Sequence, residues 1–260
     1  MLILLPPSEG KTAPRRGKAL DLGSLAFPAL EASRAEVLQA LRSLCTTDDD
    51  TVAARVLGLG PTQADQVGLD ARVLESPTAR ADQVYSGVLY DALDIASLSA
   101  AGRRRATSWL AVTSGLFGLL RLSDRIPAYR LSGGVSLPGI GPVSTYWSYR
   151  LDPAVREAAG RGLVVDLRSS TYASFWRPGP DLGARTVSVR VLHEAEGRRM
   201  VVSLFNKATK GRIVRALLEE GAAVSSPARF ADHLRSLGWK VEEGSRTRQG
   251  SRFDVVVSDL

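Results

Sequence analysis

Four short apolar runs, each followed directly by a polar turn, constrain the fold of this chain more than any other feature. The runs are residues 2–5, 109–113, 163–167 and 201–205. Runs of this length bounded by turn residues are typical of strands buried in a sheet. Ligands of such α/β sheets bind beyond the carboxyl ends of the strands. The pattern predicts an α/β fold in which the polar turns line a shared cleft.

The turn after the first run carries a lysine between two hydroxyl groups. Pro6 and Pro7 end the strand, because proline fixes φ and donates no ladder hydrogen bond. Lys11 then lies between Ser8 and Thr12 in the sequence Ser-Glu-Gly-Lys-Thr. A Walker A loop needs two glycines before the lysine at fixed spacing, and here only Gly-Lys-Thr matches, which excludes a P-loop ATPase. An anion site and an ordinary solvated turn remain as alternatives.

A pair of glycines separates two short helical segments near residues 47–70. The sequence predicts helices over 29–44, 49–57 and 62–69, and Leu57-Gly58-Leu59-Gly60 lies between the second and the third. In a helix–hairpin–helix element, glycines at these places let backbone N–H groups approach a DNA phosphate. Gly-x-Gly also occurs at plain helix C-termini, which is the alternative.

The remaining elements are expected from periodicity and turn residues. They are a short apolar helix over 116–121, a loop or hairpin over 132–142, a helix over 144–159, strands over 186–192 and 200–205 joined by a turn at 194–198, helices starting near 207 and 230, and paired terminal strands over 239–241 and 252–257. A helix starting at Lys207 would place Lys207 and Lys210 in its first turn, against the helix dipole. That placement favours an anion bound nearby, with solvated surface charge as the alternative.

Charge and composition limit the kinds of partner and ligand that this chain can have. The net charge is +7 and the pI is about 9.9, which favours a polyanionic partner such as nucleic acid, although an arginine-rich composition also follows from a GC-rich genome. A single cysteine, Cys45, and two histidines exclude an internal disulfide and give no metal-ligand set, so no metal or cofactor is expected. Neither a membrane-spanning run nor a basic leader precedes the first strand, and we expect a cytoplasmic protein without membrane contact.

Several segments together resemble one family, the YaaA-like proteins of the bacterial peroxide-stress response. The resemblance is carried by residues 1–4 with Pro7, Lys11 and Thr12, by residues 84–87, 114–121, 127–131, 146–147 and 165–167, and by Tyr172, residues 203–205, Lys207, Lys210, Gly211 and Arg215. It implies a single α/β domain over residues 1–260, with unusual topology, a positively charged cleft and a helix–hairpin–helix element. It also implies binding to duplex or branched DNA.

Two functions from different classes follow. The first is a DNA-binding protein without chemistry of its own. The second is an enzyme acting on a nucleotide, a nucleoside or a phosphorylated small molecule, in which Lys11, Lys207 and Lys210 hold the anion. Asp166 is then the candidate general base, Lys11 a second candidate catalytic residue, and Tyr129 or Tyr172 orients the substrate. The other candidate anion- or nucleic-acid-binding residues are Thr12, Gly58, Gly60, Ser114, Arg130, Ser169, Arg212 and Arg215.

Overall fold

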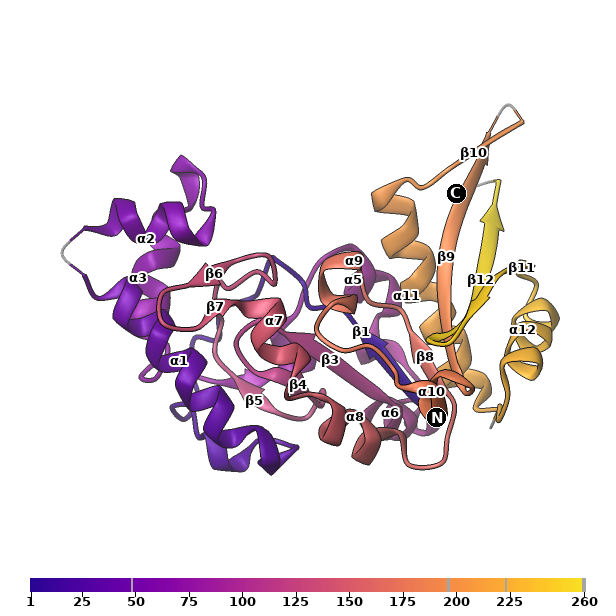
Figure 1. The fold of residues 1–260 in the computed structure, drawn as a ribbon, viewed down its shortest axis with the longest axis horizontal. Coiled ribbons are helices and arrows are strands. Elements are labelled where there is room, and N and C mark those ends of the chain that lie inside the picture. The colour runs from indigo at the N-terminus through magenta and orange to yellow at the C-terminus, as the bar shows by residue number, and fades with distance from the viewer. Residues whose placement is uncertain (48, 196, 223, 259–260) are drawn as a thin grey trace.

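A central mixed sheet with β1 near its middle organises the computed structural model, which describes residues 1–47, 49–195, 197–222 and 224–258 (Figure 1). The strands lie in the order β11-β12-β9-β8-β1-β3-β4, and β10 pairs with β9. Their bounds are β1 Leu2–Leu5, β3 Leu110–Ser114, β4 Gly118–Leu120, β8 Val164–Asp166, β9 Thr186–Ala195, β10 Arg198–Met200, β11 Lys240–Thr247 and β12 Gly250–Val257. Two small antiparallel pairs lie outside it, β2 Ala79–Arg80 with β5 Arg125–Ile126 and β6 Ser136–Leu137 with β7 Gly141–Pro142.

The middle of the sheet is parallel and its edges are antiparallel. β12, β9, β8, β1 and β3 pair in parallel, whereas β4 and β11 pair antiparallel to their neighbours. Leu5 is in register with Val112 of β3, and Leu4 with Asp166 of β8. The carboxyl ends of β1, β3 and β8 therefore meet at one edge, as the sequence predicted for these three strands.

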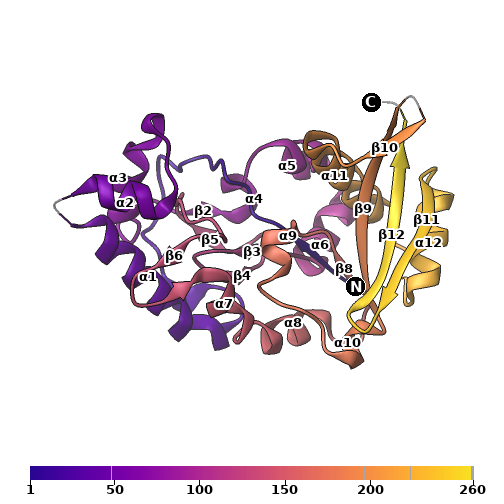
Figure 2. The ribbon, with the colours of Figure 1, turned by 45° about the horizontal axis from the view of Figure 1, so that its top comes forward.

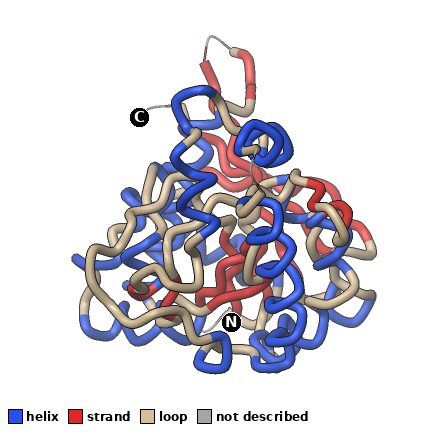
Figure 3. Tube along the Cα trace, turned by 90° about the vertical axis from the view of Figure 1, so that its left-hand side faces the viewer, coloured by secondary structure: helices blue, strands red, loops and turns tan. Residues whose placement is uncertain are grey.

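Helices surround the strands and extend the molecule at both ends. α1, α2 and α3 gather at one end, whereas α11 and α12 accompany β9, β11 and β12 at the other (Figures 1 and 2). Seen from the end that carries α1–α3, the strands run through the middle with helices around them (Figure 3). The helices are α1 Glu31–Cys45, α2 Asp50–Leu57, α3 Asp65–Ala71, α4 Ala81–Val84, α5 Val88–Leu93, α6 Ala100–Trp109, α7 Val143–Ser148, α8 Asp152–Ala159, α9 Ser170–Ala173, α10 Pro180–Gly183, α11 Ser203–Glu220 and α12 Pro227–Ser236.

Four short 3-10 turns complete the described elements, η1 Leu22–Ser24, η2 Pro28–Leu30, η3 Pro61–Gln63 and η4 Ile95–Ser97. Among the residues that the structure describes, no helix combines the length and the apolar character needed to cross a membrane.

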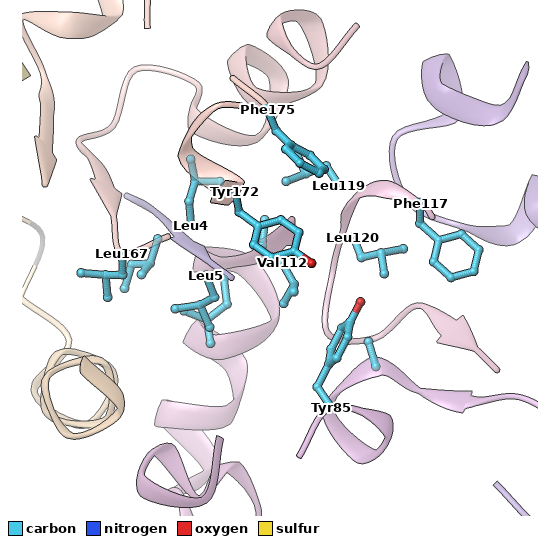
Figure 4. Close-up of a cluster of buried hydrophobic side chains, with 14 of the residues drawn as sticks. Leu4, Leu5, Tyr85, Val112, Phe117, Leu119, Leu120, Leu167, Tyr172 and Phe175 are labelled. Atoms are coloured by element: carbon cyan, nitrogen blue, oxygen red, sulfur yellow. The ribbon is translucent and has the colours of Figure 1, made fainter. Parts of the chain in front are cut away.

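The core lies directly beneath the ends of the parallel strands. Leu4 and Leu5 of β1, Val112 of β3 and Leu167 after β8 are fully buried, and Tyr172 packs beside them (Figure 4). Burial of such side chains contributes roughly 1.5–3 kcal/mol each relative to exposure. The loops that follow these strands therefore stand on a rigid base.

Two helix predictions differ from the structure. Residues 116–121, expected as a short helix, contain β4, which pairs antiparallel with β3 through Val112 and Leu120. A short apolar run does not distinguish a strand from a helix. Here the edge of β3 that faces away from β1 offers backbone hydrogen-bonding groups, and residues 118–120 pair with them as a strand. The helix expected over 144–159 is two helices, α7 and α8. Pro153 explains the division, because proline fits the first turn of a new helix and breaks the interior of a continuous one.

The fourth predicted strand is also wrong. Residues 201–205 do not form a strand, since β10 ends at Met200 and α11 already begins at Ser203. Lys207 and Lys210 therefore lie beyond the first turn of α11, and their expected opposition to the helix dipole is not present. A β9–β10 hairpin is present near the predicted place, but β9 continues to Ala195 and β10 covers Arg198–Met200, so the returning strand shares only Met200 with the predicted 200–205. Residue 196 of the predicted turn lies outside the described residues.

The two-glycine segment lies between two helices as expected, but only the first has the predicted bounds, since α3 begins at Asp65 and not at residue 62. α2 begins after Asp49, whose side chain accepts a hydrogen bond from Thr51 N, and ends at Gly58, which has a φ of 67°. Pro61 then opens η3, and α3 follows. Gly58 is needed at the left-handed position, because other residues adopt positive φ at a cost of about 1–2 kcal/mol. Residue 48 of the predicted segment lies outside the described residues.

Candidate functional site

The loop after β1, residues 6–12, is held at the carboxyl edge of the sheet by residues 84–86. Lys11 forms an isolated antiparallel bridge with Tyr85, and Thr12 N donates to Val84 O at 2.8 Å. Ser86 N donates to Ser8 Oγ at 3.1 Å. We call residues 6–12 the β1 loop. Thr12, a predicted anion ligand, is exposed, and its backbone holds the loop in place.

The β1 loop separates two cavities, both of which Glu9 and Gly10 line. The first, of about 420 Å³, lies between the β1 loop, residues 86–90 and the start of α11, and we call it the α11 cavity. The second, of about 530 Å³, lies between the β1 loop, residues 128–130 and the segment from η3 to α3, and we call it the α3 cavity. Both volumes are within the range of small-molecule sites, about 300–1,000 Å³.

Lys11 lines the α3 cavity, and its ammonium group is largely removed from water. Its Nζ donates to Ser8 O at 2.9 Å and lies 4.2 Å from the ring centroid of Tyr129 and 5.7 Å from that of Tyr85. Burial lowers the pKa of Lys11 to about 8, against the opposing charge of Glu9 and with the repulsion of Arg130. Its amine is therefore easier to deprotonate than that of an exposed lysine.

Beneath Lys11 lies a buried chain of hydroxyl groups. The hydroxyl of Tyr129 lies 2.9 Å from that of Tyr85 and 2.7 Å from Ser114 Oγ. Ser114 Oγ in turn accepts from Phe117 N at 2.9 Å. Burial raises the pKa of both tyrosines, which keeps them protonated as donors. Ser114, predicted as an anion ligand, is fully buried in this chain and supports the tyrosines under Lys11.

Asp70, which the sequence did not single out, is a fully buried carboxyl group near Lys11. Its Oδ1 accepts from Arg130 N at 2.8 Å, and its Oδ2 has no hydrogen-bond partner among residues 1–47, 49–195, 197–222 and 224–258. Burial raises the pKa of Asp70 to about 7, although Arg130 and Lys11 act to lower it. The available signal was an acidic residue three positions after Val67, directly after the predicted helix of residues 62–69 and on the buried face of the observed α3.

Arg130 and Tyr172 are brought together by Glu9. Arg130 Nη1 donates to Glu9 O at 3.1 Å and lies 3.3 Å from Glu9 Oε2. The hydroxyl of Tyr172 donates to Glu9 Oε1 at 3.4 Å and accepts from Gly133 N at 3.1 Å. Arg130 lines the α3 cavity and Tyr172 the α11 cavity, so Glu9 joins the two walls.

The first turns of α11 close the other cavity. Lys207 is exposed at its rim, while Lys210 is buried and its Nζ donates to Leu167 O at 3.1 Å. Burial lowers the pKa of Lys210, with Asp166 opposing the shift. Asn206, also unnoticed in the sequence, lines the cavity with a buried Oδ1 that finds no partner in the part of the chain that the structure describes. Ser169 lines the same cavity.

Asp166, the candidate general base, forms an ion pair with Arg168 and lines a cavity other than the α11 and α3 cavities. It accepts from Arg168 Nε at 2.9 Å and Nη2 at 2.7 Å, and both residues line a third cavity, of about 470 Å³, with Ser170 and Thr186. Burial acts to raise the pKa of Asp166, but the charge and hydrogen bonds of Arg168 outweigh it and hold the pKa below its usual value. A carboxylate held in this way is a weak base.

Two other predicted anion ligands on α11 lie apart from these cavity walls. Arg212 is exposed, and Arg215 Nη1 donates to the carbonyls of Leu93 at 3.1 Å and Asp94 at 2.8 Å, which ties α11 to the end of α5. Gly58 and Gly60 lie in the turn that precedes η3, and η3 in turn lines the α3 cavity through Thr62 and Gln63. The structure thus gathers Lys11, Arg130, Ser169, Tyr172, Lys207 and Lys210 around two adjoining cavities.

Comparison with known proteins agrees with the resemblance read from the sequence. The family model described as "Peroxide stress protein YaaA" matches residues 1–244. A UPF0246 protein of Streptomyces coelicolor is 48% identical over 262 residues, covering 100% of each chain. A UPF0246 protein of Corynebacterium efficiens is 40% identical over 244 residues, covering 93% of this chain and 95% of the relative. One from Ruegeria is 30% identical, covering 85% and 87%. The chain therefore belongs to the YaaA family of peroxide stress proteins.

Proposed function

We propose that this peroxide stress protein binds duplex or branched DNA, with the phosphate backbone lying along the two adjoining cavities. The observation that carries the proposal is the charge of their walls. Five basic side chains line the two cavities against two acidic ones, the basic residues being Lys11, Arg72, Arg130, Lys207 and Lys210. Contacts between such side chains and phosphates supply most of the sequence-independent affinity of DNA-binding proteins.

The two-glycine turn supports the same reading. Gly58 and Gly60 precede η3, and a Cβ at Gly58 would meet open space, so nothing of the protein covers this side of the turn within contact distance in the described chain. A helix–hairpin–helix element presents backbone N–H groups to a phosphate from such a turn. Here Gly58 N and Leu59 N donate to carbonyls of α2, so the N–H that a phosphate would take over is that of Gly60, which donates to the Gln63 side chain at 3.2 Å. Because η3 and α3 also line the α3 cavity, DNA held at this turn would lie beside Lys11 and Arg130.

The test is binding of a labelled duplex of about 20 base pairs, and of a four-way junction, at about 50 mM salt, measured by fluorescence anisotropy. Arg72→Glu and Lys207→Glu reverse exposed charges at opposite ends of the proposed surface, and each is expected to weaken binding about tenfold. Arg161→Glu is the matched control, because Arg161 is exposed in the turn before β8, at the opposite edge of the sheet. Absence of binding to both DNAs would refute the proposal.

A nucleotide or nucleoside in the α11 cavity is the second candidate, and Asn206 favours it. Its buried Oδ1 lines the cavity beside Lys207 and Lys210, where the amino group of a ligand could satisfy it and the lysines could hold a phosphate. Calorimetric titration with nucleoside monophosphates and the matching nucleosides tests this candidate. We expect Lys210→Gln to lower the affinity for the phosphorylated ligands alone. Absence of heat with every nucleotide would eliminate the candidate.

A further inference from the structure

We infer that Lys11 forms a covalent imine with the aldehyde of an abasic deoxyribose in DNA, held in the α3 cavity. The inference rests on the proposed DNA binding and names the chemical group that the bound DNA presents to this cavity. The geometry that carries it is the meeting, in one cavity, of a lysine amine and the segment that follows the two-glycine turn. Lys11 and Tyr129 line the cavity together with Thr62, Gln63 and Gln66 of the chain from η3 to α3.

The surroundings of Lys11 differ from those of a lysine that only binds phosphate. Lys11 rests on the rings of Tyr129 and Tyr85 and donates to Ser8 O, whereas Lys207 is exposed at the other cavity. With a pKa of about 8, about one Lys11 side chain in ten is neutral at pH 7, compared with about one in 2,500 for an exposed lysine. Desolvation and a neighbouring cation are the means by which lysines become nucleophiles toward carbonyl groups.

The charged groups around Lys11 come from three elements. Glu9 of the β1 loop and Asp70 of α3 act to raise its pKa, and Arg130 acts to lower it, while burial has the largest effect. Asp65 and Arg72 of the α3 segment line the same cavity. The buried carboxyl of Asp70 is a positioning residue, since its charge acts on Lys11 and its Oδ1 holds the backbone of Arg130.

The choice of an aldehyde follows from the chemistry of DNA. A neutral amine condenses with carbonyl carbons, and the reactive carbonyl of a DNA strand is the C1′ aldehyde exposed when a base is lost and the sugar ring opens. An abasic nucleotide is also inexpensive to turn out of the helix, because it has no base to unpair or unstack. A cavity of about 530 Å³ accommodates a group of this size.

The reaction needs no oxidant, reductant or metal. Lys11 Nζ attacks C1′ and a C–N bond forms, giving a carbinolamine. The carbinolamine oxygen then leaves as water, carrying the two protons that the neutral amine nitrogen gives up, and a C=N bond remains. Addition of water reverses the step and restores the lysine and the aldehyde.

The experiment is trapping of the imine with sodium borohydride, which reduces it to a stable secondary amine. Full-length protein is mixed with an abasic duplex in the presence of borohydride, and binding of the same duplex is measured in parallel by anisotropy. We expect a protein–DNA adduct whose peptide map locates the modification to Lys11. The adduct should form faster as the pH rises through about 8, the pKa of Lys11.

Matched lysine variants separate this lysine from the others. Lys11→Arg retains the positive charge and should lose the adduct at least about tenfold, whereas Lys18→Arg, at an exposed lysine of the segment after the β1 loop, should trap as the wild type does. If Lys11→Arg does not fold, as judged by circular dichroism, the peptide map of the wild-type adduct decides the assignment alone.

Each other outcome is decisive. Bound abasic duplex without an adduct overturns the inference and leaves the proposed function standing, whereas failure to bind any DNA defeats both. An adduct mapped to another amine overturns the assignment to Lys11. Free 2-deoxyribose 5-phosphate carries the same aldehyde, so equally efficient trapping of this sugar would show that the cavity takes a free sugar phosphate and not DNA.

Discussion

Lys11 and Asp70 show how burial sets the chemistry of single residues at this site. Burial disfavours the charged form of each group, so it lowers the pKa of Lys11 to about 8 and raises that of Asp70 to about 7. Their mutual attraction opposes both shifts without cancelling either. Groups with pKa values near neutrality are those able to exchange protons at physiological pH, and such groups gather at functional sites.

The raised pKa of Asp70 predicts a pH-dependent stability. An unfolded Asp loses its proton near 3.8, whereas folded Asp70 keeps it until about 7, so between these values the unfolded state binds fewer protons. The free energy of unfolding of the wild type should therefore fall as the pH rises from about 4 to about 7, by at most about 4 kcal/mol from this residue. Asp70→Asn removes this titration while keeping an acceptor for Arg130 N.

Urea unfolding of both proteins at about pH 5 and about pH 7.5 measures the effect. We expect the stability of Asp70→Asn relative to the wild type to be greater at the higher pH. An equal difference at both values would mean that Asp70 is not held protonated by the fold.

The residue scale is also where prediction from sequence was most uneven. Lys11 and Tyr172 were predicted because a polar turn after a buried strand and the resemblance to a family both mark them, whereas Arg130 was marked by the resemblance alone. Asp70 and Asn206 were missed, because what distinguishes them is burial of one unpartnered oxygen within the described chain, a property created by tertiary packing. Asp166 was singled out as a lone carboxylate, and sequence spacing gave no sign that Arg168 would fold back onto it.

At the scale of elements, close packing of α11 against α5 fixes one wall of the α11 cavity. Gly211 makes this approach possible, since a Cβ there would lie 2.3 Å from Leu89 O and 2.9 Å from Ala92 Cβ. Leu89 also lines the cavity, so displacement of α11 would change the shape of the site.

Gly211→Ala should therefore destabilise the protein by about 1–3 kcal/mol, because the added methyl group must displace backbone. Gly134→Ala is the control, as a Cβ at Gly134 meets nothing within 4 Å. Its free energy of unfolding should stay within about 0.5 kcal/mol of the wild type. Urea denaturation measures both, and equal stability of the two variants would contradict the close approach of α11 and α5.

Helices and strands were predicted correctly where periodicity and turn residues within the segment determine them. They were predicted wrongly where contacts with distant segments determine whether a short run forms a helix or a strand. The helix of residues 29–44 and the terminal strand pair were predicted from periodicity and turn residues, and α1, β11 and β12 confirm them. Gly118–Leu120 became β4 because β3 offers it a partner, which no property of those three residues reveals. Ser203–Phe205 joined α11 for the same kind of reason, since an apolar run of this length fits either structure.

At the scale of the whole molecule, the charge of +7 predicts how DNA binding should respond to salt. If the three basic side chains of the cavity walls that are not buried, Arg72, Arg130 and Lys207, each contact one phosphate, the logarithm of the binding constant should fall with the logarithm of the salt concentration with a slope of about −2.7. Anisotropy titrations between about 50 and about 300 mM salt measure the slope.

Arg72→Glu should make this slope shallower by about one unit, since one phosphate contact is lost. The control Arg161→Glu should leave it unchanged. A slope near zero for the wild type would mean that DNA, if bound, is not held through its phosphates.

The β1 loop forms a wall of both the α11 cavity and the α3 cavity, so binding in one cavity can affect binding in the other. Glu9 and Gly10 line both cavities, and Glu9 contacts Arg130 on one side and Tyr172 on the other. A ligand that displaces the β1 loop from one cavity changes the volume and the charge of the other cavity. By reciprocity, whatever factor the first ligand imposes on the affinity for the second, the second imposes on the first. Binding in one cavity would then be coupled to binding in the other through the contacts of Glu9.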